Sequence, residues 1–147
     1  MSASRIVLTY ADVKRLIAHR EPFLLISHVR ENIIGKKLTA IGIQSHRPVV
    51  PHDLYVLEGL GQASAVLLRQ MPEYEDKPFP AFAGMKNVVW TQEDADPQNE
   101  LLFTVELKRR MRGKFGTIDA VAHLGDMQIC SAELTFSFLR LDPEVKK

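Results

Sequence analysis

The stretch LYVLEGLGQASAVLL, residues 54–68, decides the fold of this 147-residue chain. Only Glu58, Gln62 and Ser64 are clearly polar in it, so apolar residues extend around nearly the whole circumference of the helix that it predicts. A helix of this composition must be buried on all sides. Asp53 stands just before the stretch and is a plausible N-cap. We therefore expect a long helix in the interior of the protein.

The segments around this helix predict a short helix and several strands. Thr9 and Asp12 have the spacing of a capping box, and the short helix that they start should end before Pro22. Strands are expected at residues 23–29, 37–44, 81–91, 101–110, 115–124 and 127–141. The last four should form an antiparallel meander, with Gly125 and Asp126 in a tight hairpin turn. The expected architecture is one α+β domain over residues 1–147, in which an antiparallel sheet wraps the long helix.

The composition excludes several classes of protein. Apolar residues make up 46% of the chain and charged residues 25%, and 19 Lys and Arg against 18 Asp and Glu leave a net charge of +1. This balance argues against a nucleic-acid binder, which needs a surplus of cations. No apolar run approaches the ~20 residues that span a bilayer, and no leader-like start is present. Cys130 is the single cysteine, so we expect neither a disulfide nor a cysteine-rich metal site in this cytoplasmic domain.

Glu58 is the most informative polar residue. Gln62 stands four residues later, on the same face of the predicted helix, and is expected to hydrogen-bond the carboxylate. Burial would raise the pKa of Glu58 and suit it to general acid catalysis near neutral pH. The alternative is a carboxylate at a subunit interface. Gly59 and Gly61 each cost the helix about 1 kcal/mol against alanine, which either simple packing or the close approach of a backbone or ligand would explain.

Two of the five histidines are candidate catalytic bases. His46 lies in a proline-rich irregular segment, a rigid loop setting of the kind that carries function. His52 precedes the long helix, where the helix dipole favours a neutral imidazole. A structural role is the alternative for each. We expect His19 to cap the last carbonyls of the short helix, and His28 and His123 to be structural residues of strands.

The run of cations from Lys108 to Lys114 is the strongest local charge feature. Such a run is typical of a solvated strand end, and the alternative is a patch that receives an acidic partner or a phosphate. Cys130 is expected to be a packed residue and not a nucleophile. The sequence contains no glycine-rich phosphate loop, no Ser-His-Asp order and no metal-ligand spacing.

Four segments in order resemble one known family. They are LIAHREPFLL at 16–25, PVVP at 48–51 followed by EGLGQ at 58–62, FAG at 82–84, and VELKRR at 105–110. Together they are similar to segments of the hot-dog-fold β-hydroxyacyl-acyl carrier protein dehydratases of fatty-acid synthesis. The resemblance implies a hot-dog fold and a dimer with two active sites at its interface. It also implies dehydration of a 3-hydroxyacyl thioester, carried on acyl carrier protein or CoA, without a cofactor or a metal.

The resemblance also implies roles for particular residues. Glu58 would be the helix carboxylate that acts together with a histidine of the other subunit, and Gly84 would offer an amide that polarises the thioester carbonyl. Phe82 and Gln62 would contact the substrate. The carrier would be received by two cations of the charged run, Arg109 and Arg110.

The chain departs from the family where the catalytic histidine is expected. The family motif F-F-x-G-H-F-P-G is largely missing, and the candidates are His46, 12 residues before Glu58, and His52, six residues before it. The third alternative is that neither of these two histidines is the catalytic base. Two other functions therefore stay open: a hot-dog thioesterase whose helix carboxylate activates water, and a non-enzymatic acyl-binding chain or partner subunit of a heteromeric dehydratase.

Overall fold

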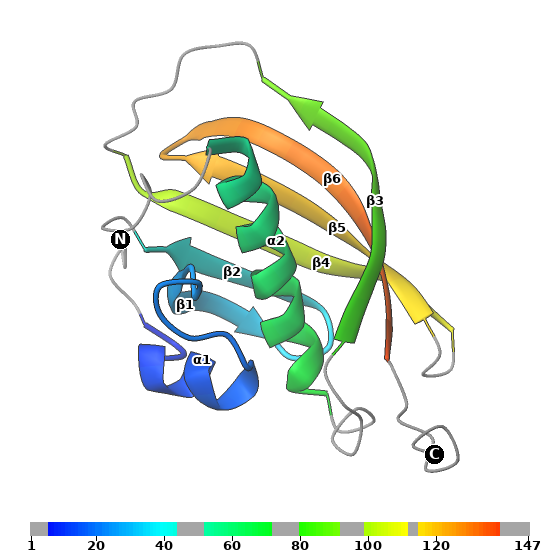
Figure 1. The fold of residues 1–147 in the computed structure, drawn as a ribbon, viewed down its shortest axis with the longest axis horizontal. Coiled ribbons are helices and arrows are strands. Elements are labelled where there is room, and N and C mark those ends of the chain that lie inside the picture. Colours follow the sequence, from blue (N-terminus) through cyan, green and yellow to red (C-terminus); the bar gives the residue numbers. More distant parts are fainter. Residues whose placement is uncertain (1–5, 44–51, 72–79, 92–98, 112–114, 139–147) are drawn as a thin grey trace.

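The computed structural model describes residues 6–43, 52–71, 80–91, 99–111 and 115–138. These residues form two helices and six strands in an α+β arrangement (Figure 1). Their order is α1 (Tyr10–Leu16), β1 (Ile26–Ile33), β2 (Lys37–Gly42), α2 (His52–Arg69), β3 (Pro80–Trp90), β4 (Leu101–Met111), β5 (Phe115–Leu124) and β6 (Met127–Phe138). None of the described helices is long and apolar enough to cross a membrane.

The strands form one antiparallel sheet in the order β1-β2-β4-β5-β6-β3. The expected meander is therefore correct for β4, β5 and β6 and wrong for β3, which pairs with β6 at the far edge, while β4 pairs with β2. Figure 1 shows the reason: α2 crosses in front of the sheet after β2, so the chain re-enters the sheet on the other side of the helix. An alternating pattern identifies a strand but does not identify its neighbour.

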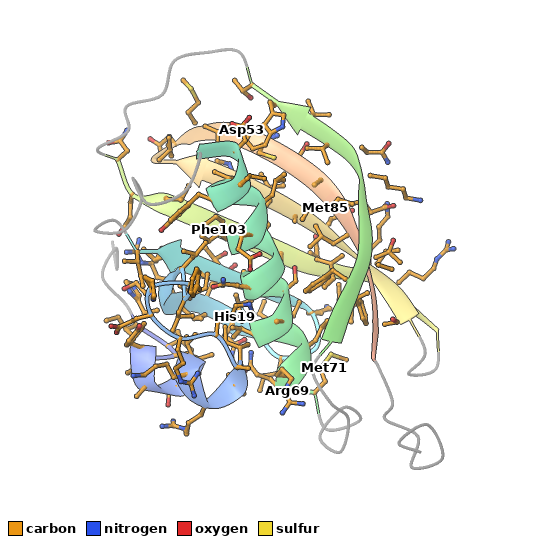
Figure 2. All side chains as sticks on the ribbon, viewed as in Figure 1. His19, Asp53, Arg69, Met71, Met85 and Phe103 are labelled. Carbon is orange, nitrogen blue, oxygen red and sulfur yellow. The ribbon has the colours of Figure 1, made fainter. Side chains whose placement is uncertain are left out.

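The core lies between α2 and the sheet, and α2 packs against β1 to β5. Phe103 of β4 is fully buried beneath the helix (Figure 2). A Cβ atom at Gly59 would lie 2.1 Å from Cζ of Phe103, so this glycine lets the helix rest directly on the aromatic ring. At Gly61 the nearest atom would be 3.9 Å away, on Phe82. Packing against β4 therefore explains Gly59, and no comparable close approach is present at Gly61.

One face of α2 is open, which corrects the expectation that the helix is buried on all sides. Leu54 is 60% exposed, the Glu58 side chain is 54% exposed, and Gly61 is partly exposed. These three residues, at positions i, i+4 and i+7, share a face, which we call the open strip. The described sheet of a single chain packs against the opposite side of the helix and leaves the open strip uncovered, with β3 along its border.

Several local predictions are confirmed and others are shifted by a few residues. Thr9 is the N-cap of α1, and its capping box with Asp12 is complete. The turn at Gly125, with φ of 60°, joins β5 to β6 as expected. In contrast, α2 begins at His52, so Asp53 lies in its first turn and is not the N-cap. Strand β1 begins later than predicted because Phe23 lies in a turn, where its N–H donates to the carbonyl of Arg20.

Candidate active site

Gln62 joins Glu58 to the segment that precedes β1. Its side chain is 1% exposed, and its Oε1 accepts from the N–H of Leu25 at 2.8 Å. Its Nε2 donates to the carbonyl of Phe23 at 2.8 Å and to Glu58 Oε2 at 3.0 Å. The predicted hydrogen bond between Gln62 and Glu58 is therefore present. Because the buried amide uses both its oxygen and its nitrogen, it holds the carboxylate and the loop together.

His19 is the second group that contacts Glu58. Its Nε2 lies 3.5 Å from Glu58 Oε2, and Figure 2 shows His19 beside α2. The expectation that His19 caps α1 is wrong, because the carbonyl of Leu16, the last residue of α1, accepts from Arg69 Nε at 3.2 Å, and Arg20 serves the carbonyls that follow. The Arg20 guanidinium donates to the carbonyl of Ile17 at 3.0 Å and to that of His19 at 2.7 Å. His19 is thus free to meet the carboxylate of its own chain.

These contacts lower the pKa of Glu58, whereas the sequence predicted that burial would raise it. The hydrogen bond from His19 is the largest influence and lowers the pKa of Glu58; burial raises this pKa, and the bond from Gln62 lowers it further. The net direction is downward, so the prediction of a raised pKa is wrong. The half-exposed carboxyl group loses too little hydration to outweigh two donors aimed at one oxygen. Glu58 is therefore a carboxylate at neutral pH.

The sequence contained a signal that could have identified His19 as a residue of the site. The residue stands in a His-Arg pair between apolar residues, in one of the four segments that carry the family resemblance. The pair lies in an irregular segment before Pro22, a setting much like that of His46. Helix-end position alone suggested a cap, and nothing local indicated that α2 passes beside this loop.

The edge strand β3 borders the open strip on its other side. Phe82 is the residue nearest to the Cβ position of Gly61, which places its ring at the strip, one helical turn from Glu58. Gly84 pairs with Thr135 next to a register shift between Phe82 and Gly84. A Cβ at Gly84 would meet no described atom within 4 Å, so the approach to its backbone is open. Phe82 is thus brought to the strip, and Gly84 follows along the exposed edge strand.

The two predicted catalytic histidines are not placed against Glu58. His46 lies outside the described residues, as do the prolines around it. His52 begins α2, six residues or about 9 Å of helix axis before Glu58, and its side chain is outside the described part. Both assignments remain predictions.

The run of cations is partly neutralised within the chain. Lys108 Nζ lies 3.3 Å from Glu133 Oε2 and 3.8 Å from Asp119 Oδ1. Arg109 is exposed on β4, whereas the Arg110 side chain and residues 112–114 lie outside the described part. Of the two predicted carrier contacts, only Arg109 can be placed, on the exposed surface.

The remaining candidates behave as structural groups. Burial raises the pKa of the Cys130 thiol to about 11, as expected for a packed cysteine. Burial also lowers the pKa of His28, which lies on β1 as predicted, with Arg30 acting in the same direction. Among the described residues, no group of three or more His, Cys, Asp or Glu side chains is placed to hold a metal ion.

Two relatives match almost the whole chain, although no family model does. The chain is 34% identical over 140 residues to the 3-hydroxyacyl-[acyl-carrier-protein] dehydratase FabZ of Enterococcus faecalis, covering 88% of this chain and 96% of the relative. It is 30% identical over 143 residues to the FabZ of Macrococcus caseolyticus, covering 90% and 97%.

Solved structures share the fold at lower identity. The dehydratase heterocomplex ApeI:P of Xenorhabdus doucetiae matches with a TM-score of 0.72 and 17% identity, over 91% of this chain and 95% of that one. A mutant thioesterase of Pseudomonas aeruginosa matches with a TM-score of 0.58 and 15% identity, over 77% and 82%. Together with the sheet wrapped around α2, these likenesses confirm the expected hot-dog architecture.

Proposed function

The chain belongs to the FabZ family of 3-hydroxyacyl-[acyl-carrier-protein] dehydratases, and we propose that it converts a 3-hydroxyacyl thioester on acyl carrier protein to the trans-2-enoyl thioester. Because the members of this family are dehydratases, the protein is a hydro-lyase. The observation that supports this reaction is a carboxylate, Glu58, held by His19 and Gln62 on the open strip of an otherwise buried helix. A fixed titratable group at a half-exposed position is what proton transfer to a bound substrate requires.

In the proposed reaction, a histidine removes the Cα proton and Glu58 protonates the departing hydroxyl group. The C–H bond breaks, the Cα=Cβ double bond forms, the Cβ–O bond breaks and water leaves. Because Glu58 is ionised in the resting chain, the proton that it gives to the hydroxyl must first be on its carboxyl group, so the reacting pair is a protonated Glu58 and a neutral histidine; after the step the Cα proton is on the histidine and Glu58 is a carboxylate. The histidine is His46 or His52 of a second copy, and the amide of Gly84 polarises the thioester carbonyl.

The contacts of Glu58 support different roles for its two carboxylate oxygens. Within the described residues, the hydrogen bond from Gln62 at 3.0 Å and the ion-pair contact with His19 at 3.5 Å both go to Oε2. Oε1 is therefore the oxygen that meets the substrate hydroxyl. Phe82, across the open strip from His19, lines the acyl chain, and Gln62 acts through Glu58.

Wild-type protein tests this function directly. We expect a 3-hydroxyacyl thioester to yield an enoyl thioester, measured by its ultraviolet absorbance and by mass spectrometry, with faster turnover on acyl carrier protein than on CoA. The ionised state of Glu58 and the fold likeness to a thioesterase favour one competing activity, water activation. Release of free thiol without enoyl product would therefore contradict dehydration. Turnover that appears only when a second hot-dog chain is added would indicate a heteromeric dehydratase.

We also propose that the active form is a homodimer paired through β3. This strand is an edge of the sheet, and it exposes Met85 (37%), Val88 (36%) and Val89 (60%). Leu54 of the open strip is 60% exposed as well. An unpaired edge that carries exposed apolar residues is the usual template for strand pairing with another chain. Pairing there would bring loops of a second copy towards the open strip.

Val89→Glu is expected to convert the dimer into a monomer and to abolish dehydration. A carboxylate on the paired strand would lie at the interface among apolar residues and would lose hydration on association. Sedimentation velocity and the enoyl assay measure the two effects. Ile34→Glu is the matched control, because Ile34 is 62% exposed in the turn between β1 and β2, away from β3. An active wild-type monomer, or an equal loss in both variants, would contradict the proposed interface.

The proposed carrier surface includes Arg109 and Arg110, which would attract an acidic carrier protein. Since Lys108 is already paired with two carboxylates, the attraction comes from the arginines and from the cations of residues 112–114. The cytoplasmic location also remains a prediction.

A further inference from the structure

We propose that His19 is a positioning residue for Glu58 of the same chain, and that its imidazole holds the carboxyl group in place on the open strip. This inference deepens the proposed function and rests on it for the catalytic role of Glu58. It means that one half of the site, comprising Glu58, Gln62 and His19, is complete within a single chain. The histidine that removes the Cα proton is then a separate group.

The loop that carries His19 is anchored on both sides. Before it, Ile17 is 3% exposed and ends α1 with a hydrogen bond to Val13. After it, Leu24 is fully buried, and the carbonyl of Phe23 is held by the buried Gln62. Arg20 closes the loop on itself by bonding two of its carbonyls. The contact of His19 with Glu58 therefore belongs to a fixed backbone and is not a chance meeting of two surface side chains.

The ring of His19 also indicates which nitrogen carries the proton. Its Nδ1 is buried and has no hydrogen-bond partner among the described residues, while Nε2 faces the carboxylate. A neutral ring with its hydrogen on Nε2 donates to Glu58 and leaves only a lone pair unpaired at Nδ1. Nε2 is therefore the ring nitrogen placed to donate a hydrogen bond to Glu58.

Other charged groups near the pair are engaged elsewhere. On the loop, Arg20 bonds backbone carbonyls, and Glu21 accepts from the Tyr10 hydroxyl at 2.9 Å. On β3, Lys86 pairs with Glu133 at 3.2 Å. On α2, Asp53 acts on the pKa of Cys130 and not on that of Glu58. Among the described groups, His19 and Gln62 are therefore the ones that lower the pKa of Glu58, against the effect of burial.

Three variants test this role: His19→Ala, His19→Gln and the control His123→Gln, whose histidine lies on β5. His19→Ala should raise the pKa of Glu58, because burial then acts on the carboxyl group with less opposition, so the protonated form that donates to the hydroxyl persists to higher pH. We expect kcat/KM to fall about tenfold or more, because the carboxyl group is no longer held in place, and to fall less at alkaline pH, where more of Glu58 is protonated than in the wild type. His19→Gln retains a neutral donor and should restore most of the loss. His123→Gln should behave as wild type.

Carbon-13 NMR of the Glu58 carboxyl group gives a readout that does not depend on turnover. The pKa of Glu58 measured in this way should be higher in His19→Ala than in the wild type. Thermal melting shows whether this variant folds. An unmoved titration of Glu58 and an unchanged kcat/KM in a folded His19→Ala would overturn the inference. If His19→Ala does not fold, a wild-type pKa of Glu58 at or above the ordinary value overturns it instead. Failure of the wild type to dehydrate would sink the proposed function and leave this titration unaffected.

Discussion

Glu58→Gln is expected to lower kcat/KM for dehydration by about 10²–10⁴-fold, because the amide cannot pass a proton to the leaving hydroxyl group. The substitution keeps the shape of the side chain, and an amide N–H or oxygen can still meet Gln62 and His19. Since Glu58 is half-exposed, we expect little change in the unfolding free energy at neutral pH. Hydration of a crotonyl or longer enoyl thioester measures the loss in the reverse direction.

A matched variant separates the chemistry from a general change of charge. Glu31→Gln also removes one carboxylate, on the exposed part of β1, where Glu31 lies 3.9 Å from Lys37. It should retain full activity. Equal activity of Glu58→Gln and the wild type would show that Glu58 is not the proton donor, and the function would then have to be sought among the open alternatives.

Gly59→Ala is expected to destabilise the protein by about 3 kcal/mol, at the upper end of the range for an overpacked core. The added Cβ would lie 2.1 Å from Cζ of Phe103 and 2.6 Å from each Cε atom. Phe103 of β4 is fully buried between α2 and the sheet, so its ring has no free space into which it could move. The helix must lift off the sheet or the ring must leave its rotamer. Urea unfolding measures the loss as a lower midpoint.

Gly61→Ala is the matched control on the same helix. Its nearest neighbour would be 3.9 Å away on Phe82, an ordinary contact, so the variant should gain up to about 1 kcal/mol from helix propensity. A second test removes the aromatic ring. In the Gly59→Ala background, Phe103→Leu should recover part of the stability that Gly59→Ala loses. A Gly59→Ala protein as stable as Gly61→Ala would contradict the proposed packing.

The sequence by itself determined the features that arise between near neighbours in the chain. The apolar stretch 54–68 predicted α2, and the capping box at Thr9 and the turn at Gly125 each formed as expected. The bond between Glu58 and Gln62 followed from helical spacing alone. Local geometry fixes such features, because residues three or four apart in a helix, or two apart in a hairpin turn, meet whatever the rest of the chain does.

Only the tertiary structure decided which distant segments meet. It placed β3 beside β6, left the open strip of α2 uncovered, and brought His19 to Glu58 across 39 residues of sequence, which lowered a pKa that burial alone would raise. None of these follows from periodicity, since alternation does not name a strand's neighbour and an apolar helix does not reveal which face a curved sheet leaves open. The charge state of Glu58 depends on donors contributed from a different element, and a donor's position is a property of the packed fold.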